Sequence, residues 1–315
     1  MTYDAVTPEQ LARSVIAVPP LARRPDYSSD AEGNRRILEH LARGGVTTAL
    51  YGGNANFYNI SVAEFATVLD QLEEVAPKGT WLIPSIGPDF GKACDQVSLL
   101  KGRALPTAMV LPLNFPTTSS GVATGLRKIA DLYGRPIIAY VKALGYITPA
   151  DLAAVVADGA VCAIKYAVVQ QDPAVDPYLE ELVQLVDVRR MVSGIGERPA
   201  IAHLTRFGLN GFTSGSVCVA PGMSTGMLRA LKAGRVDEAA RLQQNFIPLE
   251  DLRDSHSPLR VLHAAVAAAG IAETGPLMPF LSNLDDQKVL AAVAEAAKAL
   301  LAADAAYRPL APAIA

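Results

Sequence analysis

A lysine at the end of an apolar run is the residue of this chain best suited to covalent chemistry. Lys165 follows the apolar residues 160–164 and precedes a second apolar segment that starts at Tyr166. Burial of a lysine takes its ammonium group out of water, which disfavours the charged form and lowers the pKa. A neutral amine of this kind can attack a ketone and form a Schiff base. The ordinary alternative is a lysine whose charged end reaches solvent from a strand end.

Tyr140 is the second candidate, because it lies near the end of another apolar segment, residues 137–141. Forming and breaking a Schiff base requires a proton donor and acceptor close to the lysine. A tyrosine can serve if a hydrogen-bond network lowers the cost of ionising its hydroxyl. The alternative is a buried tyrosine whose hydroxyl only satisfies a backbone group.

Both residues belong to a regular alternation of short apolar segments and longer helical patterns. The apolar segments predict eight strands, at residues 14–18, 46–51, 81–85, 108–111, 137–141, 161–165, 190–193 and 211–214. Helical patterns between them include residues 31–43, 62–75, 121–133 and 179–186. Continuously apolar strands are typical of parallel sheets buried on both faces. Eight such units predict a closed (β/α)8 TIM barrel, in which Lys165 and Tyr140 would meet at the C-terminal ends of adjacent strands. An open doubly wound sheet is the alternative, but its Gly-x-Gly-x-x-Gly motif is absent from the sequence.

The strand patterns stop after Gly222, and Ala-rich helical patterns fill the remainder. We therefore expect residues 1–222 to form the barrel and residues 223–315 to form a helical C-terminal extension packed on it. The last helical pattern, residues 285–303, carries apolar residues on one face. An independent helical domain is less consistent with the sequence, because no polar linker precedes it.

Composition excludes several classes of function. The formal charge is −3 from 28 basic and 31 acidic residues, which disfavours a nucleic-acid partner. No apolar run reaches the roughly 18 to 20 residues of a membrane span. Residues 1–10 lack the pattern of a signal peptide, so a cytoplasmic location is expected. The cysteines and histidines show neither disulfide nor metal-ligand spacing, so no metal is expected; they are Cys94, Cys162, Cys218, His40, His203, His256 and His263.

Several short motifs occur in a fixed order along the chain. They are Gly52-Gly53-Asn54-Ala55-Asn56-Phe57-Tyr58, Arg135-Pro136-Ile137-Ile138 before Tyr140, Ala163-Ile164-Lys165, Ser193-Gly194, Gly208-Leu209-Asn210-Gly211-Phe212, Ser257-Pro258-Leu259-Arg260 and Gly275-Pro276-Leu277-Met278-Pro279. Together they resemble the dihydrodipicolinate synthase and N-acetylneuraminate lyase family of class I aldolases. The resemblance implies that Lys165 forms a Schiff base with a 2-oxo acid and that Tyr140 relays protons. It implies no cofactor, since the lysine itself supplies the electron sink.

The same resemblance implies substrate-binding and assembly residues. Ser193 and Gly194 would line the substrate site. Homodimers or homotetramers are common in the family, through the loops after the third and fourth strands. This chain keeps the apolar residues Leu111, Leu113 and Phe115 in the second of these loops. An isologous interface is therefore expected there.

The loop after the second predicted strand departs from the family pattern. Members usually carry Gly-Thr-Thr-Gly-Glu or Gly-Ser-Thr-Gly-Glu, whereas this chain has Gly-Gly-Asn-Ala-Asn at residues 52–56. Gly53, Asn54 and Asn56 are the candidates that remain for binding the substrate carboxylate, through backbone N–H groups and side-chain amides. Because two hydroxyls and an acid are lost, pyruvate should bind weakly. The following Phe57-Tyr58 resembles the sugar-acid dehydratase branch of the family.

Two further departures concern the synthase reaction itself. The loop after the fourth strand has no tyrosine, and no arginine follows Tyr140 at the expected distance. True dihydrodipicolinate synthase activity is therefore not expected. Lys142 and Tyr146 are candidates for recognising another substrate, although a solvated lysine and a packed tyrosine are the ordinary interpretations.

Three functions remain open on the sequence. The first is a Schiff-base lyase or aldolase acting on a 2-oxo acid. The second is a 2-oxo-3-deoxy sugar acid dehydratase that uses the same lysine. The third is a non-catalytic binding barrel, since the carboxylate-binding loop is replaced.

Overall fold

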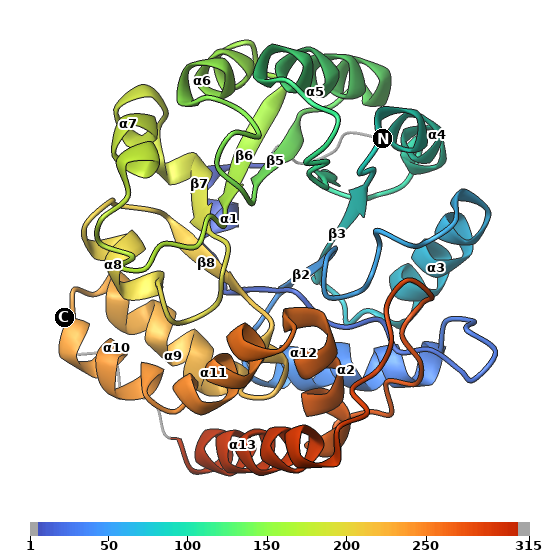
Figure 1. The fold of residues 1–315 in the computed structure, drawn as a ribbon, viewed down its shortest axis with the longest axis vertical. Helices are drawn as coiled ribbons and strands as arrows, with labels where there is room; N and C mark the ends of the chain where they lie inside the picture. The colour runs from blue at the N-terminus through green and yellow to red at the C-terminus, as the bar shows by residue number, and fades with distance from the viewer. Residues whose placement is uncertain (1–5, 308–315) are drawn as a thin grey trace.

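Eight parallel strands close into a barrel in sequence order, with each strand hydrogen-bonded to the next and β8 to β1 (Figure 1). The computed structural model describes residues 6–307. The strands are β1 (Ile16–Ala17), β2 (Thr48–Tyr51), β3 (Trp81–Ile86), β4 (Met109–Val110), β5 (Ile137–Val141), β6 (Val161–Tyr166), β7 (Met191–Ser193) and β8 (Gly211–Ser214). Nearly every strand residue is buried, as continuous apolar segments require. The predicted TIM barrel is confirmed.

Helices surround the barrel. They are α1 (Pro8–Leu11), α2 (Ala31–Arg43), α3 (Val62–Val75), α4 (Phe90–Leu100), α5 (Ser119–Tyr133), α6 (Pro149–Ala157), α7 (Pro177–Leu185), α8 (Ala200–Thr205) and α9 (Pro221–Lys232), with the 3₁₀ turns η1 (Val188–Arg190) and η2 (Ser216–Cys218). Helix α1 precedes β1, α2 to α8 run between consecutive strands, and α9 follows β8. Side-chain caps begin several of them. Asp30, Ser61, Asp89, Thr118 and Thr148 each accept a backbone N–H from the first turn of α2 to α6.

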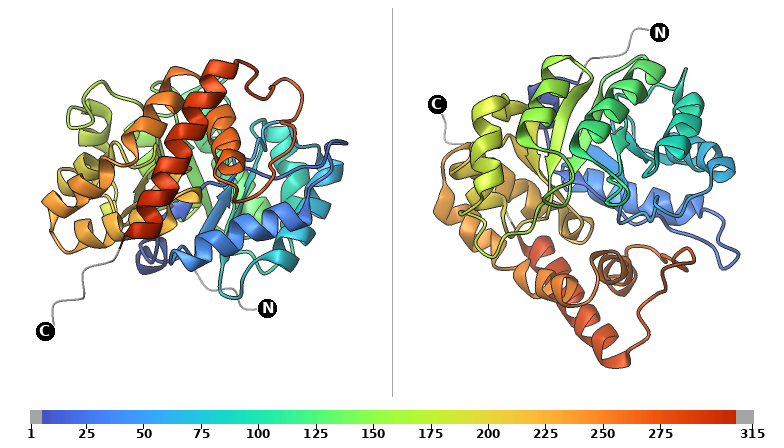
Figure 2. Two further views of the ribbon diagram at one scale, coloured as in Figure 1. Left: turned by 90° about the horizontal axis from the view of Figure 1, so that it is seen from below. Right: turned by 45° about the horizontal axis from the view of Figure 1, so that its top comes forward.

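Four further helices form the C-terminal region: α10 (Val236–Gln243), α11 (Ile247–Ser255), α12 (Pro258–Ala268) and α13 (Gln287–Ala306). They enclose a second, smaller apolar core, which includes Phe246 just before α11 and residues of α11, α12 and α13 such as Leu249, Val261, Val293 and Leu300. Figure 1 shows α13 on the outside of this region, on the opposite side of the ring from β5 and β6, and the right view of Figure 2 shows the same arrangement. Residues near the end of α11 and in the first turns of α12 line the central cavity of the barrel; they are Arg253, Asp254, Pro258, Leu259 and Leu262.

Helix α9 belongs to the barrel as well as to the extension. It contacts α2 and α8, its two neighbours in the ring, and its Met227 and Leu228 are part of the main core. The predicted division at residue 222 falls inside this helix. We therefore propose that the barrel continues to the end of α9, with the extension starting at α10.

Residues 1–5 and 308–315 lie outside the described residues. The first residues of the predicted barrel domain, the last residues of the predicted extension and the start of the N-terminal segment 1–10 therefore fall outside them. Within residues 6–307, no helix is both long enough and apolar enough to cross a membrane.

Candidate active site

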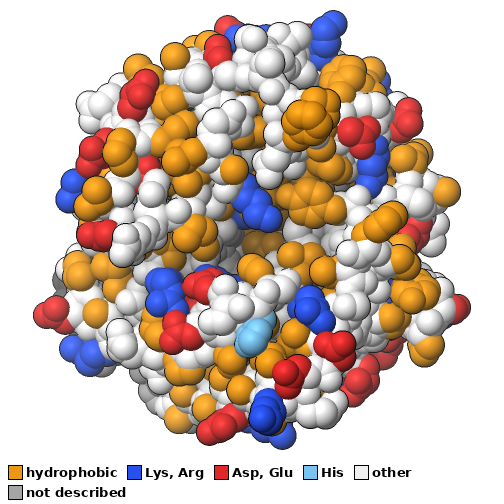
Figure 3. All heavy atoms as spheres, viewed as in Figure 1, with side chains coloured by type: hydrophobic (Ala, Val, Ile, Leu, Met, Phe, Trp, Pro, Cys, Tyr) orange, Lys and Arg blue, Asp and Glu red, His pale blue; other side chains and the backbone are white. Residues whose placement is uncertain are grey.

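A cavity of about 190 Å³ lies at the C-terminal end of the barrel. The face of the molecule seen in Figure 3 is hollowed near its centre, inside the ring of helices. Residues from β5, β6, the loops after β2 and β7, and helices α11 and α12 line the cavity. Six of the predicted site residues are among them: Gly53, Asn54, Tyr140, Lys142, Lys165 and Gly194.

Lys165 and Tyr140 are direct neighbours across the β5–β6 pair. Their Cα atoms are register partners, so both side chains leave the sheet on the same side, into the cavity. The Lys165 Nζ lies 3.7 Å from the centroid of the Tyr140 ring. It also donates a hydrogen bond of 3.2 Å to the carbonyl oxygen of Gly194. The amine is therefore held over the tyrosine ring rather than extended toward solvent.

The environment of Lys165 favours the neutral amine. Only 4% of the residue is exposed. Burial, and secondarily the positive charge of Lys142, lower its pKa to about 7. Near neutral pH a substantial fraction is therefore unprotonated and able to act as a nucleophile.

Gly194 is required where the chain passes Lys165. A Cβ added at this residue would lie 2.7 Å from the Tyr166 carbonyl oxygen and 3.1 Å from the Cγ of Lys165. Any larger residue would displace the lysine side chain or the strand. Gly194 thus contributes through its small size and its carbonyl oxygen.

Gly53 and Asn54 form one wall of the cavity. Within the described part of the chain, their backbone N–H groups donate to no protein acceptor. The Asn54 side chain is fixed by a 3.0 Å hydrogen bond from Nδ2 to the carbonyl oxygen of Val18. Two adjacent N–H groups without acceptors can bind a carboxylate, although this loop carries no hydroxyl at residues 52–56.

Tyr58 and Tyr146 lie beyond Tyr140, close enough that Tyr58 acts on the pKa of Tyr140 and Tyr146 on that of Tyr58. The Lys142 Nζ lies 5.8 Å from the centroid of the Tyr58 ring. Burial raises the pKa of Tyr140 far above the ordinary value and raises the pKa of both Tyr58 and Tyr146 to about 12. All three hydroxyls therefore keep their protons at neutral pH and can act as hydrogen-bond donors, while burial makes each a weaker acid than an exposed tyrosine. Tyr146 itself lines a separate groove rather than the central cavity.

Ser193 does not line the cavity, which corrects its prediction as a substrate-binding residue. It pairs in register with Tyr166, one position beyond the pair formed by Lys165 and Val192. Because successive strand side chains point to opposite faces, Ser193 faces the helices. There its hydroxyl lies 2.8 Å from Nδ1 of the buried His203.

Asn56 is also absent from the cavity lining. Its backbone adopts a positive φ of 55°, and its side chain is 3% exposed. The Nδ2 group donates to the carbonyl oxygen of Met278, and Oδ1 accepts from Asn59. Asn56 thus connects this loop to the segment before α13. Its neighbour Phe57 is fully buried between Tyr51 and Phe65, as part of the core.

Arg253 is a cavity residue that the sequence did not indicate. It lies on α11, far along the chain from the barrel strands, and is 4% exposed. Its Nη1 donates to the Ile195 carbonyl oxygen and to Glu250, and its Nε donates to Asp254. No local pattern reveals this position, because only the packing of the C-terminal helices on the β7 loop brings it to the cavity.

The donor groups of the site are amines, amides, hydroxyls and the guanidinium of Arg253. Among residues 6–307 no group of three or more histidine, cysteine or acidic side chains could hold a metal ion. The Ser214-Gly215-Ser216 turn is closely packed, since a Cβ at Gly215 would lie 2.1 Å from Leu262. The site can therefore support amine and proton-transfer chemistry through its own side chains.

Comparison with solved structures gives the same fold at low sequence identity. Dihydrodipicolinate synthase from Bacillus clausii is 22% identical with a TM-score of 0.80, covering 91% of this chain and 97% of that one. The structure described as PhdJ bound to substrate intermediate is 18% identical with a TM-score of 0.82, covering 97% and 100%. A catalytic lysine mutant of the Ruminococcus gnavus sialic acid aldolase is 16% identical with a TM-score of 0.81, covering 94% and 98%.

A search of curated proteins finds no match to this chain. The model of the dihydrodipicolinate synthetase family, however, matches residues 30–299. This span runs from the N-cap of α2 into α13, and so includes Lys165, Tyr140 and the whole cavity lining except Val18. The chain therefore belongs to the dihydrodipicolinate synthetase family.

Proposed function

We propose that this protein is a Schiff-base lyase or aldolase that acts on a 2-oxo acid through Lys165. The observation that carries the proposal is a buried lysine of lowered pKa against the ring of Tyr140. The neutral amine adds to the C2 carbonyl carbon to give a carbinolamine. Loss of water then gives the iminium ion, which withdraws electrons as a bond at C3 or C4 breaks or forms.

Tyr140 supplies the protons that these steps require. Its hydroxyl stays protonated at neutral pH, and burial raises the cost of ionising it. We therefore propose that hydrogen bonds from the bound substrate offset this cost, so that Tyr140 protonates the carbinolamine oxygen as water leaves and recovers a proton in a later step. The free N–H groups of Gly53 and Asn54 are the groups we assign to the C1 carboxylate. Lys142 would contact the remainder of the substrate. None of these steps requires a cofactor.

Dehydration of a 2-oxo-3-deoxy sugar acid is the second candidate. Expulsion of a hydroxyl group requires a proton donor beyond the one that serves the imine. Tyr58 lies close enough to Tyr140 to raise its pKa, keeps its own proton, and contacts Lys142 through its ring. A second protonated hydroxyl beside the first is what favours this reaction.

The proposal is tested by hydride trapping. The protein is incubated with pyruvate or with a longer 2-oxo or sugar acid and reduced with borohydride. Its intact mass is then measured by mass spectrometry. We expect a covalent adduct, with poor trapping of pyruvate at millimolar concentration and better trapping of longer 2-oxo acids. Absence of an adduct with every compound would favour the non-catalytic binding barrel.

The pH dependence of trapping reports the state of Lys165. Because the amine reacts only when neutral, the rate of trapping should rise with pH around a midpoint near 7. Lys142→Met removes a positive charge, which makes the protonated form of Lys165 less unfavourable. The midpoint should therefore move to higher pH, measured with cyanoborohydride as reductant.

Lys288→Met is the matched control, since this lysine is exposed on α13. Its midpoint should equal that of the unmodified protein. An unchanged midpoint in Lys142→Met would show that burial alone lowers the pKa of Lys165.

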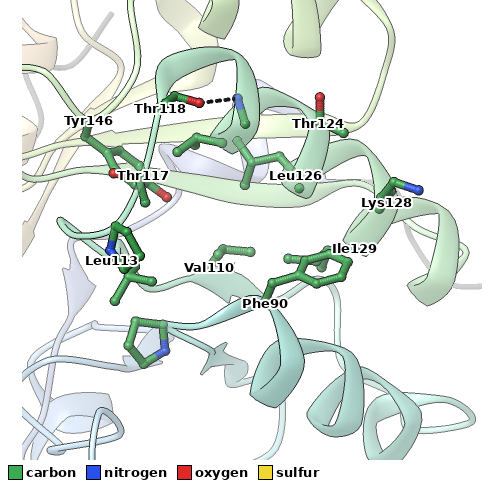
Figure 4. A pocket seen from close by; sticks show the side chains of 15 residues that line it. Phe90, Val110, Leu113, Thr117, Thr118, Thr124, Leu126, Lys128, Ile129 and Tyr146 are labelled. Atoms are coloured by element: carbon green, nitrogen blue, oxygen red, sulfur yellow. Dashed lines mark hydrogen bonds between the residues drawn. The ribbon is translucent and has the colours of Figure 1, made fainter.

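We also propose that the protein forms an isologous dimer through the segment after β4. Phe115 in this segment is 85% exposed. It lies near an apolar groove of about 580 Å³ between α4 and α5, lined by residues such as Phe90, Leu113 and Ile129 (Figure 4). Leu111, expected at the interface, is fully buried in the core and unavailable.

Light scattering checks this assembly. We expect the unmodified protein to exceed the 33.2 kDa of one chain at micromolar concentration. Phe115→Asp should shift it toward the monomer, because a carboxylate in an apolar interface must be desolvated. A monomer in the unmodified protein would contradict the proposal.

A further inference from the structure

We propose that two residues of α11 in the C-terminal extension, Glu250 and Arg253, are positioning residues for the Schiff-base lysine. They hold the backbone of the β7 loop, residues 194–198, so that the Gly194 carbonyl oxygen accepts a hydrogen bond from the Lys165 amine. The extension is then part of the catalytic site rather than a cover packed on the barrel. This inference rests on the proposed function for the role of Lys165.

The β7 loop lies directly on Lys165. The Gly194 carbonyl oxygen accepts from the Lys165 Nζ at 3.2 Å. A Cβ added at Gly194 would lie 3.1 Å from the Cγ of Lys165, so the loop backbone also packs on the stem of the lysine. Displacement of the loop would therefore remove both the acceptor of the amine and part of the cover that keeps water from it.

Arg253 binds the loop at the residue that follows Gly194. Its Nη1 donates to the Ile195 carbonyl oxygen at 2.8 Å and to the Glu250 Oε1 at 3.1 Å. Both side chains of this ion pair are buried, and the arginine Nε donates to Asp254 at 2.9 Å. The rigid guanidinium is therefore fixed in place, and it joins the loop to α11.

Glu250 and Gln243 bind the far end of the loop. The two carboxylate oxygens of Glu250 accept the backbone N–H groups of Glu197 and Arg198, each at 2.9 Å. The Nε2 of Gln243, at the end of α10, donates to the carbonyl oxygens of the same two residues at 2.8 and 2.9 Å. Residues of the extension thus hold the loop on both sides of its centre.

Gly196, at the centre of the loop, brings the backbone into direct contact with the ion pair. Its φ is 96°, and a Cβ there would overlap the Glu250 carboxylate and lie 2.5 Å from the Arg253 Nη1. Its N–H donates to the carbonyl oxygen of Thr213 on β8 at 3.0 Å. The loop is therefore fixed between the barrel and the extension, and only glycine permits this contact.

Arg253 also keeps Glu250 able to bind the loop. Burial raises the pKa of Glu250, and the charge of Arg253 opposes this effect. Only an ionised carboxylate offers both of its oxygens purely as acceptors, which the two backbone N–H groups require. Burial, and then the charge of Glu250, raise the pKa of the adjacent Glu197, which favours its neutral form and leaves the arginine to Glu250. Loss of Arg253 would therefore weaken the hold on the loop directly at Ile195 and indirectly through Glu250.

The test measures the pH at which Lys165 loses its proton, because a contact that only joined the extension to the barrel would not change this pH. Initial rates of reductive methylation by formaldehyde and cyanoborohydride are measured against pH. Peptide mass spectrometry assigns the methylation to Lys165. Lys142, the charged residue that acts on Lys165, is the same in every variant compared.

Arg253→Met should release the loop from the lysine and admit water. Burial is the largest cause of the lowered pKa of Lys165, so exposure should outweigh the loss of the carbonyl acceptor. The midpoint of methylation should therefore rise from near 7 by about one pH unit or more. At pH 7 the rate of 2-oxo acid trapping should fall about five-fold or more, in proportion to the neutral fraction of the amine.

Arg253→Lys is the conservative variant, because a lysine can still donate to the Ile195 carbonyl oxygen and balance the charge of Glu250. Its midpoint should stay closer to 7 than that of Arg253→Met. Arg260→Met is the matched control, since this arginine of the extension also donates to backbone carbonyl oxygens, but those of residues 282 and 283, outside the β7 loop. Its midpoint should equal that of the unmodified protein.

Gln243→Leu is the second variant, for the case that circular dichroism shows Arg253→Met to be unfolded. It removes only the two hydrogen bonds to the loop carbonyl oxygens, so a smaller rise of the midpoint is expected. An unchanged midpoint in the folded variants would overturn the inference, even where 2-oxo acids are still trapped and the proposed function stands. Since methylation needs no 2-oxo acid, a raised midpoint without any trapped adduct would support the inference and reject the proposed function alone.

Discussion

Replacement of Lys165 by alanine is expected to abolish hydride-trapped adducts with every 2-oxo acid that the unmodified protein accepts. No other amine lies against Tyr140 with a pKa lowered to about 7, within the described residues. Mass spectrometry of the reduced protein measures the loss directly. Turnover of the best trapped substrate should fall with it, because no iminium ion can then form.

Stability measurements show whether Lys165→Ala loses its adducts because the amine is gone or because the protein is unfolded. The pKa of Lys165 is lower in the folded protein than the ordinary value of 10.5, so the unfolded chain binds the proton more tightly. Burial of this lysine therefore costs stability below a pH near 7, and that cost fades as pH rises from 7 toward 10.5. The alanine variant should lose this pH dependence and remain folded. Adducts that persist in the alanine variant would move the imine to another lysine, with Lys142 as the next candidate.

The sequence predicted the barrel because burial on both strand faces leaves a direct signal. A strand enclosed by helices and by the barrel interior must be apolar at every position, so eight apolar runs give eight strands. The helices α2 and α3 match their predicted ranges because Asp30 and Ser61 mark their starts. The predicted first and fourth strands are longer than β1 and β4, since apolar residues continue past the last ladder hydrogen bonds.

The site was only partly predictable, for reasons of register and distance along the chain. Lys165 and Tyr140 end adjacent strands, so the fold alone brings them together. Ser193 was assigned by its motif, whereas its register with Tyr166 turns it to the opposite face. Arg253 enters the cavity only because α11 packs on the β7 loop, an arrangement between distant segments that no local pattern encodes.

Tyr140→Phe is expected to separate imine formation from turnover. The phenylalanine ring keeps the surface over which the Lys165 Nζ lies at 3.7 Å, so the amine should retain its position and slow trapping should persist. Turnover should fall by about 10²- to 10⁴-fold, the usual contribution of a positioned proton donor. Steady-state rates of the best trapped substrate, compared with hydride trapping of the same sample, measure the two effects separately.

The pH profile distinguishes a lost proton donor from a disturbed site. Because the Tyr140 hydroxyl keeps its proton throughout the neutral range, Tyr140→Phe should lower turnover about equally at each pH and leave the rise that Lys165 causes near 7 in place. Tyr178→Phe is a suitable control, since that hydroxyl donates to the Ile147 carbonyl oxygen on the helix side of the barrel. Turnover preserved in Tyr140→Phe would transfer the proton relay to Tyr58, the neighbouring hydroxyl whose pKa is raised to about 12.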